Sequence, residues 1–260
     1  MTLPTQDIAV SAMAHNRDGS LSLVCAADGS ATLFRNGEKA QRVVLAGTDH
    51  FEAAVYDNCA VALVASGGQV HGVSWHGTAM RKFSHDNTVR SDVLKFGLSS
   101  TLRRMYVARR NGYVSFQDLE TDESAGATLN VGQNSIAFSW SQDERLFGVL
   151  YDDLAIRVYD VQMGRILKSG TLGTPFQPVT FAIMRMSPDQ RQMAVSNSQS
   201  MTIDIWDITT GATVGKLTGH TAHMHTLQFS ADSDRLFSGG YDGTIREWSL
   251  KTYSQLRLIN

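Results

Sequence analysis

Residues 216–252 read KLTGHTAHMHTLQFSADSDRLFSGGYDGTIREWSLKT, and this stretch decides the fold. Residues 224–230 alternate apolar and polar side chains, as a half-buried strand does. Residues 235–240 and 244–250 predict a second and a third strand, and residues 252–260 predict a fourth. Polar turns separate these strands, so the stretch predicts a four-stranded antiparallel meander.

The ends of this stretch resemble the WD40-repeat family. The family pairs a Gly-His before the first strand with a Trp-Asp at the end of the third, at a period of about 40–45 residues. Here Gly219-His220 stands at the first position, and Trp248-Ser249 replaces Trp-Asp at the second. The resemblance implies a β-propeller in which each meander forms one blade.

The resemblance also implies a buried, hydrogen-bonded tetrad in the last blade. The matching residues are His220, Ser238, Asp242 and Trp248. A buried indole N–H needs an acceptor, a hydroxyl can supply it, and an imidazole can link that hydroxyl to a carboxylate. We therefore expect a structural role for these four residues and not a catalytic one.

The rest of the chain can be divided into weaker copies of the same pattern. At 260 residues the chain is long enough for one large all-β domain. The six predicted repeats cover 6–39, 48–77, 88–122, 133–163, 179–211 and 216–259. The positions predicted to match Trp248 are Phe34, Val73, Gln117, Tyr159 and Trp206, at spacings of about 39 to 47 residues. The sequence therefore predicts a single all-β domain, a WD40-type propeller of six blades with four antiparallel strands each.

Two details of the repeats matter below. In the fifth repeat, Ser196 and Trp206-Asp207 match the family pattern. Between the fourth and fifth repeats, residues 167–179 contain Pro175 and Pro178 and predict the longest loop between blades.

Composition sets the class of protein only broadly. The net charge is −2, which favours neither a polybasic nucleic-acid binder nor an acidic tail. The two cysteines, Cys25 and Cys59, lie in apolar runs without metal-ligand spacing. No charged-then-apolar leader and no apolar run of about 18 residues is visible. We expect an intracellular protein without membrane insertion, in the cytoplasm first, with the nucleus as the alternative.

Motifs that carry chemistry are missing. Residues 211–216 (GATVGK) are one residue short of a phosphate-binding loop and lack its Ser or Thr. His220, His223 and His225 form a small cluster, and the last two are expected on one face of a strand. Because His220 already belongs to the tetrad, a zinc ion would lack a convenient third ligand. We therefore predict no catalytic residue, no cofactor and no metal site. An enzyme on this fold would need acidic or metal-binding side chains on the innermost strands, which offer few.

A cluster of arginines in the third repeat leaves nucleic acid open as a partner. Arg103, Arg104, Arg109 and Arg110 flank one predicted strand. They form either a basic patch for phosphate, RNA or an acidic protein, or an ordinary solvated hairpin. No aromatic residue interleaves them to stack bases, so nucleic acid is disfavoured but not excluded.

The resemblance implies that partners bind the loops before the first strands and the turns between the second and third strands. The residues at these positions are Arg110, Asp152, Gln199, Tyr241 and His223. We therefore expect a non-enzymatic protein-interaction scaffold, a subunit of a larger multiprotein complex, without a small-molecule substrate. One alternative is an open-ring propeller of a coat or nuclear-pore type, completed by a blade from a partner, because no spare strand is visible for a clasp. Another is an RNA- or ribonucleoprotein-associated subunit.

Overall fold

The structure is a computed structural model that describes residues 9–16, 18–45, 50–56, 59–66, 69–85, 93–99, 103–173, 175–197 and 199–259. The predicted starts of the first three repeats, at 6–8, 48–49 and 88–92, lie outside these residues. All regular secondary structure in the described ranges is β, and nothing there forms a helix able to cross a membrane.

The chain divides into two compact units, residues 1–130 and 131–260, each with three four-stranded antiparallel sheets. In the first unit the sheets are β1 (Val10–His15), β2 (Leu21–Ala26), β3 (Ser30–Arg35) and β4 (Glu38–Val44); β5 (His50–Tyr56), β6 (Cys59–Ser66), β7 (Gln69–His76) and β8 (Ala79–His85); and β9 (Val93–Leu98), β10 (Arg104–Arg109), β11 (Tyr113–Asp118) and β12 (Leu129–Asn130).

The second unit repeats this order. Its sheets are β13 (Ser135–Trp140), β14 (Leu146–Tyr151), β15 (Ala155–Asp160) and β16 (Arg165–Thr171); β17 (Ala182–Met186), β18 (Gln192–Asn197), β19 (Thr202–Asp207) and β20 (Ala212–Thr218); and β21 (Met224–Phe229), β22 (Arg235–Gly240), β23 (Ile245–Ser249) and β24 (Ser254–Ile259). Every sheet pairs its strands in chain order. The predicted all-β fold, with six blades of four antiparallel strands, is confirmed.

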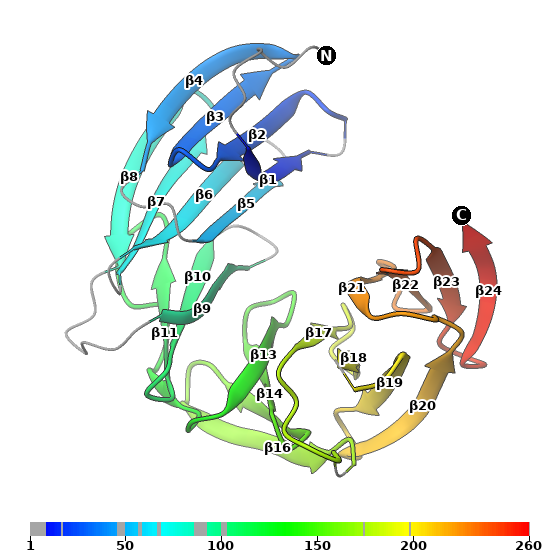
Figure 1. Ribbon diagram of the computed structural model, residues 1–260. Coiled ribbons are helices and arrows are strands. Elements are labelled where there is room, and N and C mark those ends of the chain that lie inside the picture. The colour runs from blue at the N-terminus through cyan, green and yellow to red at the C-terminus, as the bar shows by residue number, and fades with distance from the viewer. Residues whose placement is uncertain are drawn as a thin grey trace. The chain divides into compact units, whose positions relative to one another are not determined.

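Within the second unit, the sheets lie side by side along their first strands. Figure 1 shows β13, β17 and β21 together, with β16, β20 and β24 farther out. The core lies between neighbouring sheets, where Trp206 packs against Ile156 and Val158 of the preceding sheet. Trp248 packs against Ile203 and Ile205 in the same way. The last two sheets therefore each bury a tryptophan from the third strand against the sheet before it.

The register corrects the position predicted for the second blade. Trp248 pairs with Leu236, the second residue of β22, and the second residue of β6 is Ala60, which pairs with Trp75. Trp75 is fully buried against the first sheet, so Trp75 and not Val73 matches Trp248. The prediction of Val73 was wrong because Val73 is also apolar and buried, and it lies two residues before Trp75 on the same face of the strand.

The fourth strands lie beyond several of the predicted repeats. β8, β12, β16 and β20 follow the segments predicted at 48–77, 88–122, 133–163 and 179–211. The prediction of a loop over residues 167–179 is wrong for residues 167–171, because these residues belong to β16 and pair with β15. The side chains of β16 are mostly exposed, so an outermost strand keeps its backbone pairing without an apolar pattern that sequence reasoning could detect.

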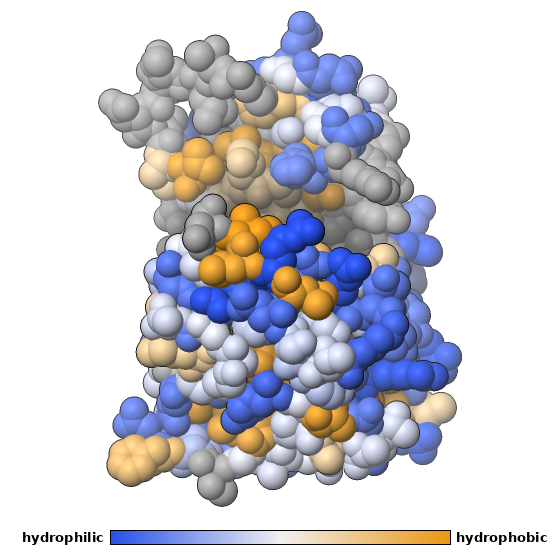
Figure 2. Space-filling view, turned by 90° about the vertical axis from the view of Figure 1, so that its right-hand side faces the viewer, coloured by the Kyte–Doolittle hydropathy of each residue, from blue (hydrophilic) through white to orange (hydrophobic). Residues whose placement is uncertain are grey.

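The last strand is the most exposed of these outer strands. Every residue of β24 is exposed, including Leu256, Leu258 and Ile259. The side of the molecule in Figure 2 carries this strand and shows hydrophobic residues in separate patches among hydrophilic ones. Among the described strands, β24 pairs only with β23, so one edge of its backbone lies at the end of the sheet.

Candidate functional site

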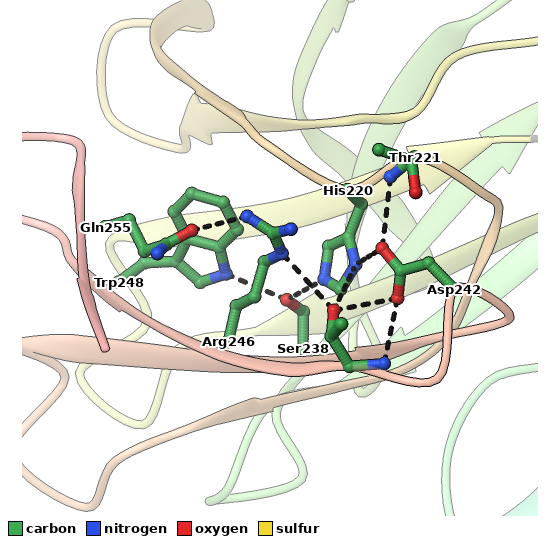
Figure 3. Close-up of polar contacts among 8 residues, drawn as sticks. His220, Thr221, Ser238, Asp242, Arg246, Trp248 and Gln255 are labelled. Atoms are coloured by element: carbon green, nitrogen blue, oxygen red, sulfur yellow. Dashed lines mark hydrogen bonds and ion pairs between the residues drawn. The ribbon is translucent and has the colours of Figure 1, made fainter. Parts of the chain in front are cut away.

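A chain of short hydrogen bonds crosses the last sheet (Figure 3). The indole Nε1 of Trp248 donates to Ser238 Oγ at 2.8 Å, and that Oγ lies 2.7 Å from His220 Nε2. His220 Nδ1 lies 2.8 Å from Asp242 Oδ2. An indole N–H can only donate, so the Ser238 hydroxyl is free to donate to Nε2 and the Nδ1–H to Asp242. Each of these four side chains then has a hydrogen-bond partner within the network.

Asp242 is held by more than the histidine. Its two carboxylate oxygens accept the backbone N–H groups of Thr221 and Thr244, each at 3.0 Å, and the Thr244 hydroxyl at 2.8 Å. Burial alone raises the pKa of Asp242, but the hydrogen bonds from Thr221, Thr244 and His220 outweigh it and hold that pKa well below its ordinary value. Asp242 is therefore an ionised anchor of the β22–β23 turn.

The residues of this network come from four different places in the last blade. His220 lies in the connection before β21, Ser238 in β22, Asp242 in the following turn and Trp248 in β23. Gly219 has a φ of +155°, which strains any residue with a side chain, and an added Cβ would lie 3.2 Å from the ring of Trp248, so glycine suits the position before the histidine. The network thus ties the incoming connection to the second and third strands.

Ser238, His220 and Asp242 stand in the hydrogen-bond order of a hydrolase triad, but the geometry does not offer a nucleophile. Only 1% of Ser238 is exposed, and its oxygen already accepts the indole N–H of Trp248. A substrate atom would have to displace that indole to reach the hydroxyl. The arrangement can stabilise the blade, and it cannot attack a substrate as it stands.

The fifth blade lacks the hydroxyl of this network. Val195 pairs with Asp204 as Ser238 pairs with Arg246, so Val195 and not Ser196 occupies the position of Ser238. In the part of the chain that the structure describes, the buried Nε1 of Trp206 has no hydrogen-bond partner. The match of Ser196 to the family pattern was wrong, because the sequence does not reveal that Val195, one residue earlier, takes the position of Ser238.

The candidate partner-binding residue Tyr241 sits on a turn that is fixed by its own backbone. Tyr241 donates its N–H to the carbonyl of His223 at 2.9 Å, and its side chain is 68% exposed. His223 is also exposed but lies just before β21, so it does not share a strand face with His225. The ring of His225 instead contacts the ring of Tyr241, with centroids 3.7 Å apart. This contact braces an exposed aromatic side chain beside a rigid network.

Asp152 and Gln199 sit at related turns and hold a shared loop. Asp152 donates its N–H to Asn134 at 3.0 Å, as Tyr241 does to His223, and its carbonyl accepts Val179 N–H at 2.8 Å. The side-chain amide of Gln199 donates to the carbonyl of Gln177. The β14–β15 and β18–β19 turns are thus joined to residues 172–181, the connection between β16 and β17.

Arg110 belongs to the first unit, where it is exposed in the turn between β10 and β11. Its neighbour Arg109 is only 2% exposed, so it cannot contribute to a surface patch. Arg103 and Arg104 lie at the other end of β10. At about 3.3 Å per residue, Arg104 and Arg110 are roughly 20 Å apart, so the arginines do not form one cluster.

Sequence reasoning missed the exposed apolar side chains near these turns. Phe176 is fully exposed, and Phe181 and Met201 are about half exposed. The sequence Pro175-Phe176-Gln177-Pro178 places a phenylalanine between the two prolines that predict the loop, and this could have indicated an exposed apolar side chain. Among the described residues, no group of three His, Cys, Asp or Glu side chains could hold a metal ion.

Comparison with known proteins agrees with this architecture. The family model described as "WD domain, G-beta repeat" matches residues 211–249, the stretch that contains most of the hydrogen-bond network. Residues 211–249 therefore match a WD40 repeat, and the six four-stranded sheets are those that a six-bladed propeller of this type requires.

Several curated relatives match parts of the chain. Periodic tryptophan protein 2 homolog of Neurospora crassa is 31% identical over 30% of this chain and 9% of its own length. Protein groucho of Drosophila melanogaster is 32% identical over 32% of this chain and 11% of its own length. U3 snoRNP-associated protein-like EMB2271 of Arabidopsis thaliana is 26% identical over 65% of this chain and 39% of its own length. The chain therefore spans less than half of each of these relatives.

Proposed function

We propose that this chain is a non-enzymatic WD40 platform for protein–protein interaction and a subunit of a larger multiprotein complex. The observation that carries the proposal is Tyr241, an exposed aromatic side chain on a turn pinned by its backbone N–H and by the neighbouring Asp242 network. Tyrosines are frequent interface anchors, and a rigid support lowers the entropy lost on binding.

The other candidate contacts in the second unit share this design. Asp152 and Gln199 stand on turns that are held by hydrogen bonds to neighbouring connections. These turns present side chains without depending on their own packing, so a partner can use them while the blades supply stability. Arg110 is the corresponding candidate in the first unit.

Two observations favour a binding role over catalysis. The polar network of the last blade is satisfied internally, and its serine is covered by Trp248. The exposed candidates Tyr241 and Arg110, by contrast, are an aromatic residue and an arginine, two residue types that are enriched at protein interfaces. We therefore propose protein partners, without a cofactor, a small-molecule substrate or insertion into a membrane.

Affinity capture of the intact protein, with its companions identified, tests the proposal. Tyr241→Ala, Arg110→Ala and Asp152→Ala should each weaken capture of the same companions while leaving the thermal unfolding midpoint within the error of wild type. Met163→Ala removes an exposed side chain from the β15–β16 turn, at the opposite end of its blade, and is the matched control. Undiminished capture by all three alanine variants would contradict the assignment of these residues as partner contacts.

A ribonucleoprotein-associated role is the second candidate, and one relative supports it. U3 snoRNP-associated protein-like EMB2271 matches 65% of this chain. Direct RNA contact would depend on exposed cations such as Arg110, so retention on RNA should fall steeply as salt rises. Retention that is absent at low salt would leave only an association through protein partners.

An open-ring structural role, completed by a blade from a partner, is the third candidate. It requires that the purified chain be incomplete alone, with a strong tendency to associate. A monodisperse monomer in sedimentation, with one cooperative unfolding transition, would contradict it.

The subcellular compartment of the chain depends on the proteins with which it assembles. We propose the cytoplasm first and the nucleus as the alternative, and a fluorescent fusion of the chain distinguishes them.

A further inference from the structure

The described residues of the connection between β16 and β17, 172–173 and 175–181, are held by one turn at two points. Leu172 donates its N–H to the carbonyl of Leu154 at 3.0 Å, and Val179 donates to the carbonyl of Asp152 at 2.8 Å. Between these two points the side chain of Gln199 donates to the carbonyl of Gln177. The connection is therefore fixed at three places, from two different blades.

Phe176 lies between these anchors, and its side chain is fully exposed. Pro175 precedes it and Pro178 follows two residues later, so the backbone on both sides has little freedom in φ. Exposing a whole phenylalanine to water is unfavourable, because burial of such a large apolar side chain stabilises a protein or a complex. A rigid loop that presents this side chain to solvent has the properties of an anchor for a partner.

More apolar surface lies close to the same loop. Phe181 ends the connection just before β17, and Met201 follows the turn that contains Gln199. Both side chains are nearly half exposed. The loop and its neighbours therefore offer several apolar contacts in addition to Phe176.

The charged residues of the loop and of the two turns that hold it are all acidic. Asp152 and the exposed Asp153 lie on the turn that holds the loop. Neither the loop 172–181 nor the turns 152–154 and 198–201 contain a lysine or an arginine. A basic group of a partner would be attracted to these carboxylates, whereas an anionic surface would be repelled by them.

We propose that residues 175–179, with Phe181, Met201, Asp152 and Asp153 around them, bind a peptide segment of a partner protein that combines an apolar side chain with a lysine or arginine. This proposal rests on the proposed role as a protein-interaction platform and names the chemistry of the partner. The apolar side chain packs on Phe176 and the basic group pairs with the two aspartates. The opposite charge of the turn disfavours an anionic membrane surface, which the test below includes.

The test selects a phage-displayed library of random peptides on the purified whole chain and measures the enriched sequences, as synthetic peptides, by fluorescence anisotropy. The enriched peptides should share an apolar residue and a lysine or arginine. Phe176→Ala should weaken their affinity by about tenfold or more, as expected for an aromatic anchor. Asp152→Asn with Asp153→Asn should weaken it less and reduce its dependence on salt. Met163→Ala should leave it unchanged.

Three results would overturn the proposal. They are failure to enrich any peptide, enrichment of peptides without a basic residue, and binding that is equal for wild type and Phe176→Ala. Sedimentation with vesicles of phosphatidylcholine and phosphatidylserine is run in parallel, and binding that Phe176→Ala abolishes there would assign the loop to a membrane instead. If companion proteins are still captured through Tyr241 while Phe176→Ala has no effect, only this inference fails and the proposed function stands.

Discussion

At the scale of single residues, one hydroxyl oxygen serves two neighbours in the last blade. Ser238 Oγ accepts from the Trp248 indole and lies within 2.7 Å of His220. Both neighbours are buried, so neither could turn to water if the hydroxyl were removed. A buried polar group without a partner costs about 1–3 kcal/mol, more than the net value of an average hydrogen bond.

Ser238→Ala should therefore lower the free energy of unfolding by about 1–3 kcal/mol, measured by urea denaturation of the whole chain. Ser254→Ala, on the exposed last strand, is the control and should change stability by less than about 0.5 kcal/mol. Equal stability of Ser238→Ala and wild type would show that the network does not hold the blade.

The indole N–H of Trp206, which has no hydrogen-bond partner among the described residues, allows the opposite experiment, in which a hydroxyl is added. Val195→Thr places a hydroxyl where Ser238 stands in the neighbouring blade, so it can accept from Trp206 Nε1. Val149→Thr is the matched control, because Val149 pairs with Arg157 as Val195 pairs with Asp204, and the hydroxyl of Tyr159, which stands where Trp206 does, already bonds to Tyr151. A buried hydroxyl without a partner costs about 1–3 kcal/mol, so the control should lose that amount and Val195→Thr about 1 kcal/mol less. Identical losses in urea denaturation would exclude the expected bond.

Asp242 gives the last blade a dependence on pH. Its folded-state pKa lies below the unfolded value of about 4, so its contribution is present above pH about 4 and is lost as pH falls below it. The stability difference between wild type and Asp242→Asn should be largest near pH 7 and shrink as the pH falls from about 4 to 2. Met163→Ala changes no titratable group, so its difference from wild type should stay constant in the same urea series. A wild-type advantage over Asp242→Asn that grows with acid would contradict the assignment.

At the scale of elements, the turn between the third and fourth strands repeats with one substitution. Asp160 Oδ1 accepts the N–H groups of Gln162 and Met163 at 2.9 and 2.8 Å. In the last blade Ser249 Oγ accepts the corresponding N–H groups of Lys251 and Thr252, both at 3.3 Å. The aspartate of the Trp-Asp pair is therefore an acceptor for its turn, and Ser249 performs the same task with longer, uncharged hydrogen bonds.

Ser249→Asp should stabilise the chain by about 0.5–1 kcal/mol, because a charged acceptor strengthens the same pair of hydrogen bonds. The reciprocal change, Asp160→Ser, should destabilise it by a similar amount. Thermal unfolding of both variants checks this, and shifts in the same direction would contradict the equivalence of the two turns.

The meanders and their number could be predicted because the inner three strands of most blades alternate apolar and polar residues and end in recognisable turns. The outer strands could not: β16 pairs through its backbone while its side chains stay exposed, so its sequence resembles a loop. Single positions failed where a neighbour of similar chemistry lay one or two residues away, as Val73 beside Trp75 and Ser196 beside Val195. The pinned turn at Tyr241 was found because the motif around it is intact, whereas Phe176 lies between blades, where the repeat pattern carries no information.

At the scale of the whole molecule, the proposed function assigns stability and recognition to different residues. The buried side chains between neighbouring sheets and the network around Ser238 hold the blades together. The exposed side chains on pinned turns, Tyr241 foremost, are available to a partner. This separation predicts that recognition can be removed without loss of folding, which an enzyme with catalytic groups in its core would not allow so easily.

The capture of companion proteins by purified Tyr241→Ala, compared with wild type and Met163→Ala at equal folded concentration, tests this separation most directly. We expect capture by Tyr241→Ala to fall by about tenfold, with an unchanged unfolding midpoint, and capture by Met163→Ala to equal that of wild type. Full capture by Tyr241→Ala, or a loss of capture that follows a loss of stability, would contradict the account.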